Sequence, residues 1–242
     1  MSLSRIEVDH VFFDAAGTLI RLKRSVGEIY SQLAVEHGFQ AMEGDLSSRL
    51  ETNFRRAFAN SPPLTCGAVS EARRLKLERD WWRRIVNESF SDLGTFPDQE
   101  EFFSNIFERF AGAEFWKLTP GCLRTLSNLK RVGKGLGVIS NFDSRLRAVL
   151  QALGILDRFQ VICISSEAQA AKPDPRIFSA AVRRMGGRAG RCLHVGNHLK
   201  DDFQGARRAG LKAALFDPRD RFPGMDFPGR IRRLNSLMEI LI

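Results

Sequence analysis

Four short apolar runs that alternate with amphipathic stretches constrain the fold of this chain more than any other feature. The runs are rich in β-branched residues and lie at 136–140, 161–165, 192–195 and 213–216. Strands that alternate with helices form βαβ units, and these units build a parallel sheet. A further run at 10–13 ends in a tight glycine turn and is expected to join the same sheet. The sequence therefore predicts an α/β fold.

Between the first run and the others, residues 25 to 111 change to helical periodicity. Ser70 and Asp98 are candidate N-caps, and Glu101 lies three residues after Asp98, as in a capping box. No strand signal interrupts the stretch, which is typical of a four-helix bundle. We therefore predict a discontinuous α/β core domain over 1–20 and 115–242, and an inserted helical domain over 21–114.

The composition excludes several classes of protein. Hydrophobic residues make up 43% of the chain and charged residues 27%, which is typical of a globular protein and not of a disordered one. No apolar run approaches the ~18 residues that a membrane span needs. Residues 1–10 contain Glu7 and Asp9 and no apolar stretch of the secretory kind. We expect a cytoplasmic protein whose four sparse cysteines are reduced thiols.

The chain carries 37 Lys+Arg against 28 Asp+Glu, a net charge of +9. Its arginine doublets are scattered through amphipathic patterns, where solvated helix faces account for them. We therefore expect neither nucleic acid nor membrane as a partner; the expected partner is a small anionic substrate, and the expected oligomeric state is a monomer or homodimer.

Polar residues follow several of the predicted strands at the point where each strand ends. They include Asp14, Ser140 with Asn141, and Asn197. Lys172 lies in a turn that follows the run at 161–165. Ligands of parallel sheets bind at the carboxyl ends of the strands. A carboxylate beside hydroxyl, amide and ammonium groups suits nucleophilic attack on a centre that carries anionic oxygens.

Four segments in this order resemble the motifs of the haloacid dehalogenase-like (HAD) hydrolase superfamily: FDAAGTL at 13–19, ISNFD at 139–143, KPDPRIF at 172–178 and HVGNHLKDD at 194–202. The resemblance covers residues 5–20 and 115–216. It implies a Rossmann-like parallel sheet core, in which the helical block over 21–114 is the family's helical cap.

The resemblance also implies roles for individual residues. Asp14 matches the nucleophile and Lys172 the cation that holds it, while Ser140 and Asn141 match positions that bind the transferred group, with Thr18 as a further substrate-binding residue. For the cofactor Mg²⁺, the matching ligands are Asp14, the backbone carbonyl of Ala16, Asn197 and Asp202.

Two positions depart from the pattern of phosphatase members. Ala16 replaces the aspartate that usually acts as general acid and base, and Asn197 replaces the first aspartate of the metal motif. An alanine transfers no proton, and a hard cation is held chiefly by carboxylates. We therefore expect weaker metal binding, with Asp201 as a candidate to compensate.

Three functions stay open. The first is hydrolysis of a small phosphorylated metabolite through an aspartyl intermediate, weakened by Ala16 and Asn197. The second is metal-independent hydrolysis of a carbon–halogen bond, as in 2-haloacid dehalogenases. The third is a catalytically weak protein that binds a phospho-ligand.

Some candidates have a structural interpretation instead. Asp202 is as consistent with capping a helix as with holding a metal. His194 lies in an apolar run and is expected in the core, and Trp81 and Trp82 are expected in the core of the helical bundle.

Overall fold

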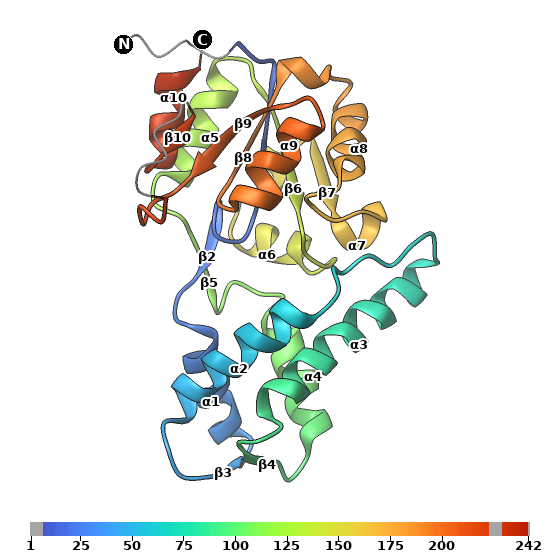
Figure 1. The fold of residues 1–242 in the computed structure, drawn as a ribbon, viewed down its shortest axis with the longest axis vertical. Helices are drawn as coiled ribbons and strands as arrows, with labels where there is room; N and C mark the ends of the chain where they lie inside the picture. Colours follow the sequence, from blue (N-terminus) through green and yellow to red (C-terminus); the bar gives the residue numbers. More distant parts are fainter. Residues whose placement is uncertain (1–6, 223–228, 242) are drawn as a thin grey trace.

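The computed structural model describes residues 7–222 and 229–241. Its centre is a six-stranded parallel sheet in the order β10-β9-β8-β1-β6-β7 (Figure 1). The strands are β1 (His10–Phe13), β6 (Gly135–Ser140), β7 (Val161–Ile164), β8 (Cys192–Gly196), β9 (Lys212–Phe216) and β10 (Arg230–Ile231). The N-terminal strand thus joins the sheet, and it lies in the middle of it. The predicted α/β class is confirmed.

Alternating side chains of β1 build the core on both faces of the sheet. Val11 and Phe13 belong to one apolar cluster and Phe12 to the other, as the twofold repeat of a strand requires. The first face is covered by α5 (Cys122–Arg131), α6 (Leu146–Ala152) and α10 (Leu237–Ile240), and the second by α8 (Pro175–Met185) and α9 (Gly205–Arg208). Short segments complete this part of the chain: η1 (Leu156–Arg158), α7 (Ser165–Ala168), η2 (Ala189–Arg191), η3 (Leu199–Gln204) and η4 (Leu234–Ser236).

The helical insertion, defined here as residues 23–115, enters and leaves through a two-stranded antiparallel ribbon. The ribbon pairs β2 (Ile20–Leu22) with β5 (Trp116–Leu118). Between them lie α1 (Val26–Glu36), α2 (Leu46–Asn60), α3 (Glu71–Phe90) and α4 (Gln99–Arg109), below the sheet in Figure 1. The expected four helices are therefore present.

The insertion also contains a strand pair that the sequence did not predict, β3 (Gln40–Ala41) with β4 (Gly94–Thr95). Two residues per strand are too short to produce an alternating pattern, so the pair follows from the packing of the helices. Ser70 and Asp98 cap α3 and α4 as predicted, and each side chain accepts a backbone N–H three residues on.

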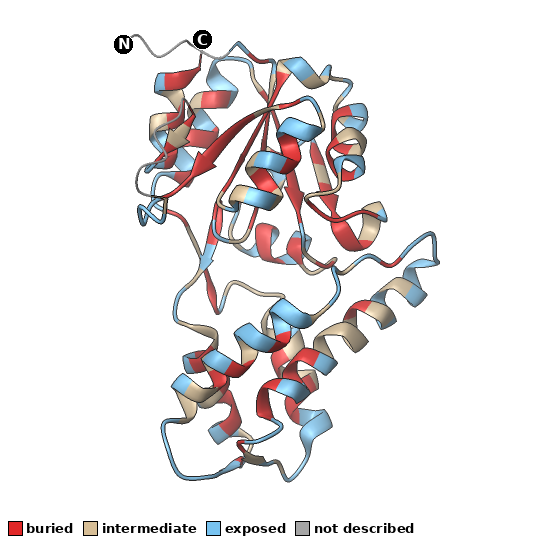
Figure 2. Cartoon of the chain, in the orientation of Figure 1, coloured by how far each residue is buried: buried red, intermediate tan, exposed pale blue. Residues whose placement is uncertain are grey.

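The insertion has its own apolar cluster, which includes Tyr30, Leu33, Phe90 and Phe102. The buried residues of Figure 2 accordingly gather in two regions, one around the sheet and one among α1 to α4. Leu22 is half-buried against the clusters of both regions. The exact domain boundaries stay a prediction.

Among the described residues, no helix is long and apolar enough to cross a membrane. All four cysteines are buried and unpaired.

Phe12 provides a test of the core, because it is fully buried between the sheet and α8. Phe12→Ala should lower the free energy of unfolding by about 3–5 kcal/mol, through lost burial and the cavity left behind. Phe58→Ala is the matched control, since Phe58 is 45% exposed. Chemical denaturation of both variants measures the difference, and equal losses would contradict this account of the core.

Candidate active site

The carboxyl ends of the central strands bring four predicted residues together. Asp14 directly follows β1, and Ser140 is the last residue of β6. Lys172 comes from the loop before α8, and Asp202 comes from η3, which follows β8. All four side chains are buried. Because β6 and β8 flank β1 in parallel register, segments more than a hundred residues apart meet at Asp14.

The Lys172 ammonium bridges two carboxylates. Its Nζ lies 2.7 Å from Asp14 Oδ1 and 2.5 Å from Asp202 Oδ1. The Ser140 hydroxyl donates to the same Asp14 oxygen at 3.1 Å. The Thr18 hydroxyl lies 3.4 Å from Asp14 Oδ2 and makes a long contact there. Asp14 therefore has one oxygen held by a cation and a hydroxyl, and a second oxygen that is only weakly engaged.

Burial dominates the ionisation of this cluster. Burial raises the pKa of Asp14 above its ordinary value, with Lys172 acting against the rise and Asp202 adding to it. Burial disfavours the charge of Lys172 too, but the two carboxylates outweigh it and raise the pKa of the ammonium. For Asp202, Lys172 and His194 outweigh burial and hold the carboxyl pKa below its usual range. The balance between burial and the Lys172 ammonium therefore sets the ionisation of both carboxylates.

Two further predicted residues orient the cluster. The Asn141 amide accepts from the Lys172 backbone N–H at 2.7 Å and donates to the Lys172 carbonyl at 2.8 Å, which fixes the lysine loop beside β6. The Thr18 hydroxyl donates to Asn197 Oδ1 at 3.2 Å and so links the turn after β1 to the turn after β8.

Glycine is required at two positions of these turns. Gly17 has a φ of +91°, and a Cβ there would lie 2.7 Å from the Asn197 amide nitrogen. A Cβ on Gly196 would lie 2.2 Å from the Asp202 carboxyl carbon. Real Cβ atoms do not approach other atoms so closely, so both glycines are needed for the carboxylates and the amide to converge.

His194 is buried, as predicted, but it also belongs to the cluster. Its Nε2 lies 3.1 Å from Asp202 Oδ1, and its ring packs edge-on against Phe178 at 5.2 Å between centroids. Burial lowers the pKa of His194, so the ring is neutral and donates from Nε2. The sequence did not indicate this contact, because a histidine in an apolar strand shows no partner until the strand and η3 are packed.

The predicted magnesium ligands are largely engaged by protein groups. Asp202 Oδ1 faces Lys172 and His194, and its Oδ2 accepts the backbone N–H of His198 at 2.8 Å. His198 is the N-cap residue of η3 and makes no side-chain cap, but the Asp202 carboxylate accepts its backbone N–H at the start of that helix. Asp201 Oδ2 lies 3.4 Å from the His198 ring nitrogen, and its role as a compensating carboxylate stays a prediction.

These residues do not fit a resident magnesium ion as they stand. Of the carboxylate oxygens of Asp14 and Asp202, only Asp14 Oδ2 lacks a cation or N–H neighbour, and the Asn197 oxygen already accepts from Thr18. Within residues 7–222 and 229–241, no group of three or more His, Cys, Asp or Glu is arranged to hold a metal. The Ala16 carbonyl as a ligand stays a prediction.

The insertion contacts the loop after β6 through groups that the sequence did not single out. Trp82 Nε1 donates to Asp143 Oδ2 at 2.6 Å, and Arg145 pairs with the same oxygen at 2.8 Å. The Ser144 hydroxyl donates to the buried Glu78 carboxylate at 2.5 Å. Since Asp143 follows Ser140 by three residues, α3 rests directly on the loop that carries part of the site.

The prediction for the two tryptophans was therefore wrong in part. Trp82 packs against the apolar cluster of the insertion, but it is half-buried and directs its N–H to Asp143. Trp81 is half-buried and donates to the carbonyl of Pro62. An indole carries a polar N–H at its edge, which favours a position between apolar packing and a hydrogen-bond acceptor.

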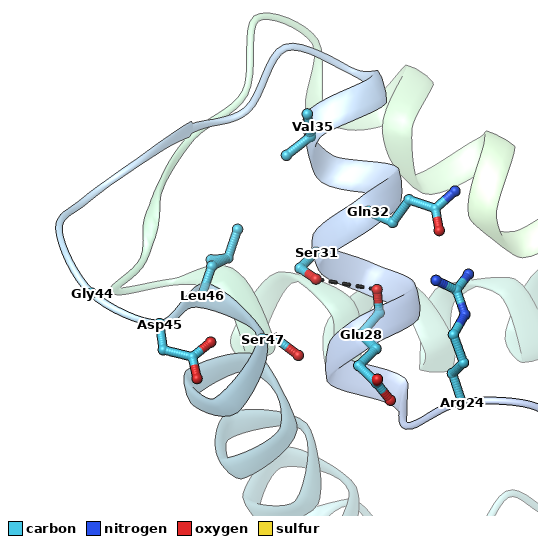
Figure 3. Close-up of a pocket in the computed structure, with 9 residues that line it drawn as sticks. All are labelled: Arg24, Glu28, Ser31, Gln32, Val35, Gly44, Asp45, Leu46 and Ser47. Carbon is cyan, nitrogen blue, oxygen red and sulfur yellow. Dashed lines mark hydrogen bonds between the residues drawn. The ribbon is translucent and has the colours of Figure 1, made fainter.

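Two hollows lie outside the buried cluster. Figure 3 shows one of about 570 Å³ between α1 and the start of α2, lined by residues that include Arg24, Val35 and Asp45. It contains none of the residues around Asp14. The other, of about 750 Å³, has both Gly17 and Asn197 in its wall and so adjoins the site.

The comparisons with known proteins agree on one family. The sequence profile of haloacid dehalogenase-like hydrolases matches residues 8–210. Haloacid dehalogenase-like hydrolase domain-containing protein 3 from Danio rerio is 32% identical over 219 residues, which cover 89% of this chain and 88% of that protein. Its counterpart from Homo sapiens is 31% identical over 214 residues, with coverages of 87% and 82%.

Solved structures of similar fold include both reaction types. A HAD phosphatase from Thermococcus onnurineus has a TM-score of 0.66 at 23% identity, covering 96% of this chain and 97% of that one. The L-2-haloacid dehalogenase from Xanthobacter autotrophicus has a TM-score of 0.68 at 18% identity, with the same coverages. A HAD-hydrolase from Bacillus subtilis, solved with magnesium bound, has a TM-score of 0.68 at 21% identity, with coverages of 97% and 99%. Identities this low establish the fold alone.

A parallel sheet with a lysine-bridged aspartate after a central strand, and a helical insertion just beyond it, places the chain in the class of α/β cores with an inserted helical unit. With the profile match over most of the sequence, this chain belongs to the haloacid dehalogenase-like hydrolase family.

The Lys172 bridge can be tested through stability. Lys172→Met leaves two buried carboxylates without their cation and should cost about 3–5 kcal/mol of unfolding free energy at neutral pH. The loss should shrink between pH 8 and pH 5, because the stranded carboxyl groups neutralise by taking up protons. Lys76→Met, at an exposed position of α3, is the control. Similar losses in both variants at every pH would show that the bridge does not support the fold.

Proposed function

We propose that the protein hydrolyses a small phosphorylated metabolite by transferring the phosphoryl group to the Asp14 carboxylate. The observation that carries the proposal is the arrangement around Asp14, where Lys172 and Ser140 hold Oδ1 and leave Oδ2 available. A buried carboxylate with one oxygen fixed by a cation is oriented for attack with the other.

The chemistry then follows from this chain's own residues. Asp14 Oδ2 attacks phosphorus, the bond to the ester oxygen breaks, and an aspartyl phosphate forms. Water next attacks that phosphorus, which releases phosphate and regenerates the carboxylate. Lys172 and the Ser140 hydroxyl stabilise the charge that moves between Asp14 and the transferred group.

The leaving group receives no proton from position 16. Ala16 has only a methyl side chain, so an alkoxide must take its proton from water, while a weakly basic phenoxide leaves without one. We therefore expect the rate to depend steeply on the basicity of the leaving group.

Ala16→Asp should change that dependence. Its carboxyl group can protonate the leaving oxygen, so kcat/KM for alkyl phosphates should rise by ~10²–10⁴ while p-nitrophenyl phosphate changes little. The measurement is kcat/KM across aryl and alkyl phosphates of graded leaving-group pKa. Ala16→Asn, similar in shape but unable to transfer a proton, should keep the steep dependence.

Asp14→Asn should remove turnover of every substrate in that series, because an amide does not form the covalent intermediate. Wild-type turnover that persists in Asp14→Asn would rule out the proposed nucleophile. An Ala16→Asp variant as slow as Ala16→Asn on alkyl phosphates would show that protonation of the leaving group is not the missing step.

Magnesium can be tested separately at position 197. Asn197→Asp adds a carboxylate beside the free oxygen of Asp14 and should tighten Mg²⁺ binding at least tenfold, because hard cations bind charged oxygens best. Titration calorimetry with MgCl₂ measures it, and Asn197→Asp combined with Asp14→Asn should lose the gain. Wild-type binding as tight as that of Asn197→Asp would contradict the poor fit described above.

A second candidate is hydrolysis of a 2-haloacid. The observation that favours it is the combination of Ala16 with Asn197, since a halide leaves without a proton and the site needs no resident cation for it. Halide release in the presence of a chelator, lost in Asp14→Asn, would support this reaction. Binding of phosphate esters with turnover of neither class would instead support a phospho-ligand-binding protein.

A further inference from the structure

An arginine-lined cleft adjoins the Asp14 site. Its volume is about 750 Å³, and its wall contains Gly17 and Asn197 from the site together with six arginines from separate segments. The arginines are Arg21, Arg124, Arg219, Arg221, Arg232 and Arg233. Among the described residues, no aspartate, glutamate or lysine lines the cleft, so the charged side chains in its described wall are all positive.

Most of this positive charge is not neutralised by the residues that the structure describes. Arg221 donates to the Asn197 carbonyl at 2.7 Å, and Arg232 pairs with Asp220 at 2.9 Å. The side chains of the other four are exposed and have no ion pair or hydrogen bond to any described residue. Four uncompensated guanidinium groups around one hollow repel one another unless an anion binds between them.

Several arginines elsewhere on the surface are paired with carboxylates instead. Arg109 contacts two glutamates, Arg191 contacts Glu7 and Asp9, and Arg147 pairs with Glu167 at 2.7 Å. What distinguishes the cleft is that six arginines from separate segments line a single hollow.

The hydrogen-bonded pair of Thr18 and Asn197 lies between the cleft and the nucleophile. Asn197 lines the cleft, its Oδ1 accepts from Thr18, and the same Thr18 hydroxyl lies 3.4 Å from Asp14 Oδ2. A ligand that reaches Asp14 with one anionic group has a positively charged hollow beside it for another. Guanidinium groups match phosphate oxygens with paired N–H donors, which favours phosphate as that second group.

We propose that the cleft binds a second phosphate of the substrate, so that the substrate class is a phosphate monoester carrying a further phosphate group. This inference rests on the proposed function, but the binding of phosphate in the cleft does not require turnover.

The first test is binding, with inorganic pyrophosphate as the probe. Titration calorimetry should show that the double variant Arg124→Gln/Arg233→Gln binds pyrophosphate at least tenfold more weakly than wild type. The matched control is Arg73→Gln/Arg84→Gln, which removes the same charge from exposed positions of α3. Its affinity should stay within twofold of wild type. Equal weakening in both double variants would trace binding to net charge and overturn the proposed site, as would absence of binding to wild type.

The second test links the cleft to the substrate. The ratio of kcat/KM for fructose 1,6-bisphosphate to that for fructose 6-phosphate should exceed one in wild type and fall at least tenfold in Arg124→Gln/Arg233→Gln. A ratio that does not change between wild type and this variant would overturn the bisphosphate class.

The variant Asp14→Asn separates this inference from the proposed function. It should bind pyrophosphate within threefold of wild type, because the arginines are intact. If the protein binds pyrophosphate but its turnover does not depend on Asp14, the proposed phosphate site is supported and the proposed nucleophile is refuted. Turnover that depends on Asp14, in a protein that does not bind pyrophosphate, would support the proposed nucleophile and refute the proposed phosphate site.

Discussion

The buried ammonium of Lys172 is the group on which the rest of the site depends. Without this ammonium, two carboxylates buried so close together would repel each other strongly or take up protons. Lys172 lies 2.7 Å from one and 2.5 Å from the other, and so allows Asp14 and Asp202 to share the end of the sheet. The Asn141 amide fixes the lysine loop, and Gly196 lets η3 approach β8 closely enough for Asp202 to reach the ammonium.

The helical insertion is tied to this site by its place in the chain and by contacts. It follows β1 by only a few residues, so the ribbon of β2 and β5 emerges beside the nucleophile. On its other side, α3 directs Trp82 and Glu78 to the loop after Ser140. Any shift of α3 relative to the sheet must therefore break charged hydrogen bonds to buried carboxylates, each worth about 1.5–3 kcal/mol. These contacts couple the position of the insertion to the loop that carries Ser140.

The charge of the chain has a different meaning once the fold is known. Near Asp14, Ala16 and Asn197 occupy positions where phosphatase members of the family usually have aspartates. Six arginines line the adjoining cleft. The arginines that line this cleft outnumber the carboxylates that pair with them, although the buried cluster itself has two carboxylates for one lysine. Part of the +9 of the sequence is thus concentrated in the cleft that we propose binds an anionic group of the substrate.

The sequence by itself determined the α/β class, the four inserted helices and the segments that meet at Asp14, because periodicity, caps and strand-end motifs are local patterns. Only the tertiary structure decided what each side chain faces. The contact of His194 with Asp202, the engaged oxygens of Asp202 and the hydrogen bond from Trp82 to Asp143 all join distant segments. The same holds for the six arginines of the cleft, which lie far apart along the chain and converge in space. Distances between residues far apart in sequence leave no local pattern, so only the packing of the strands and helices sets them.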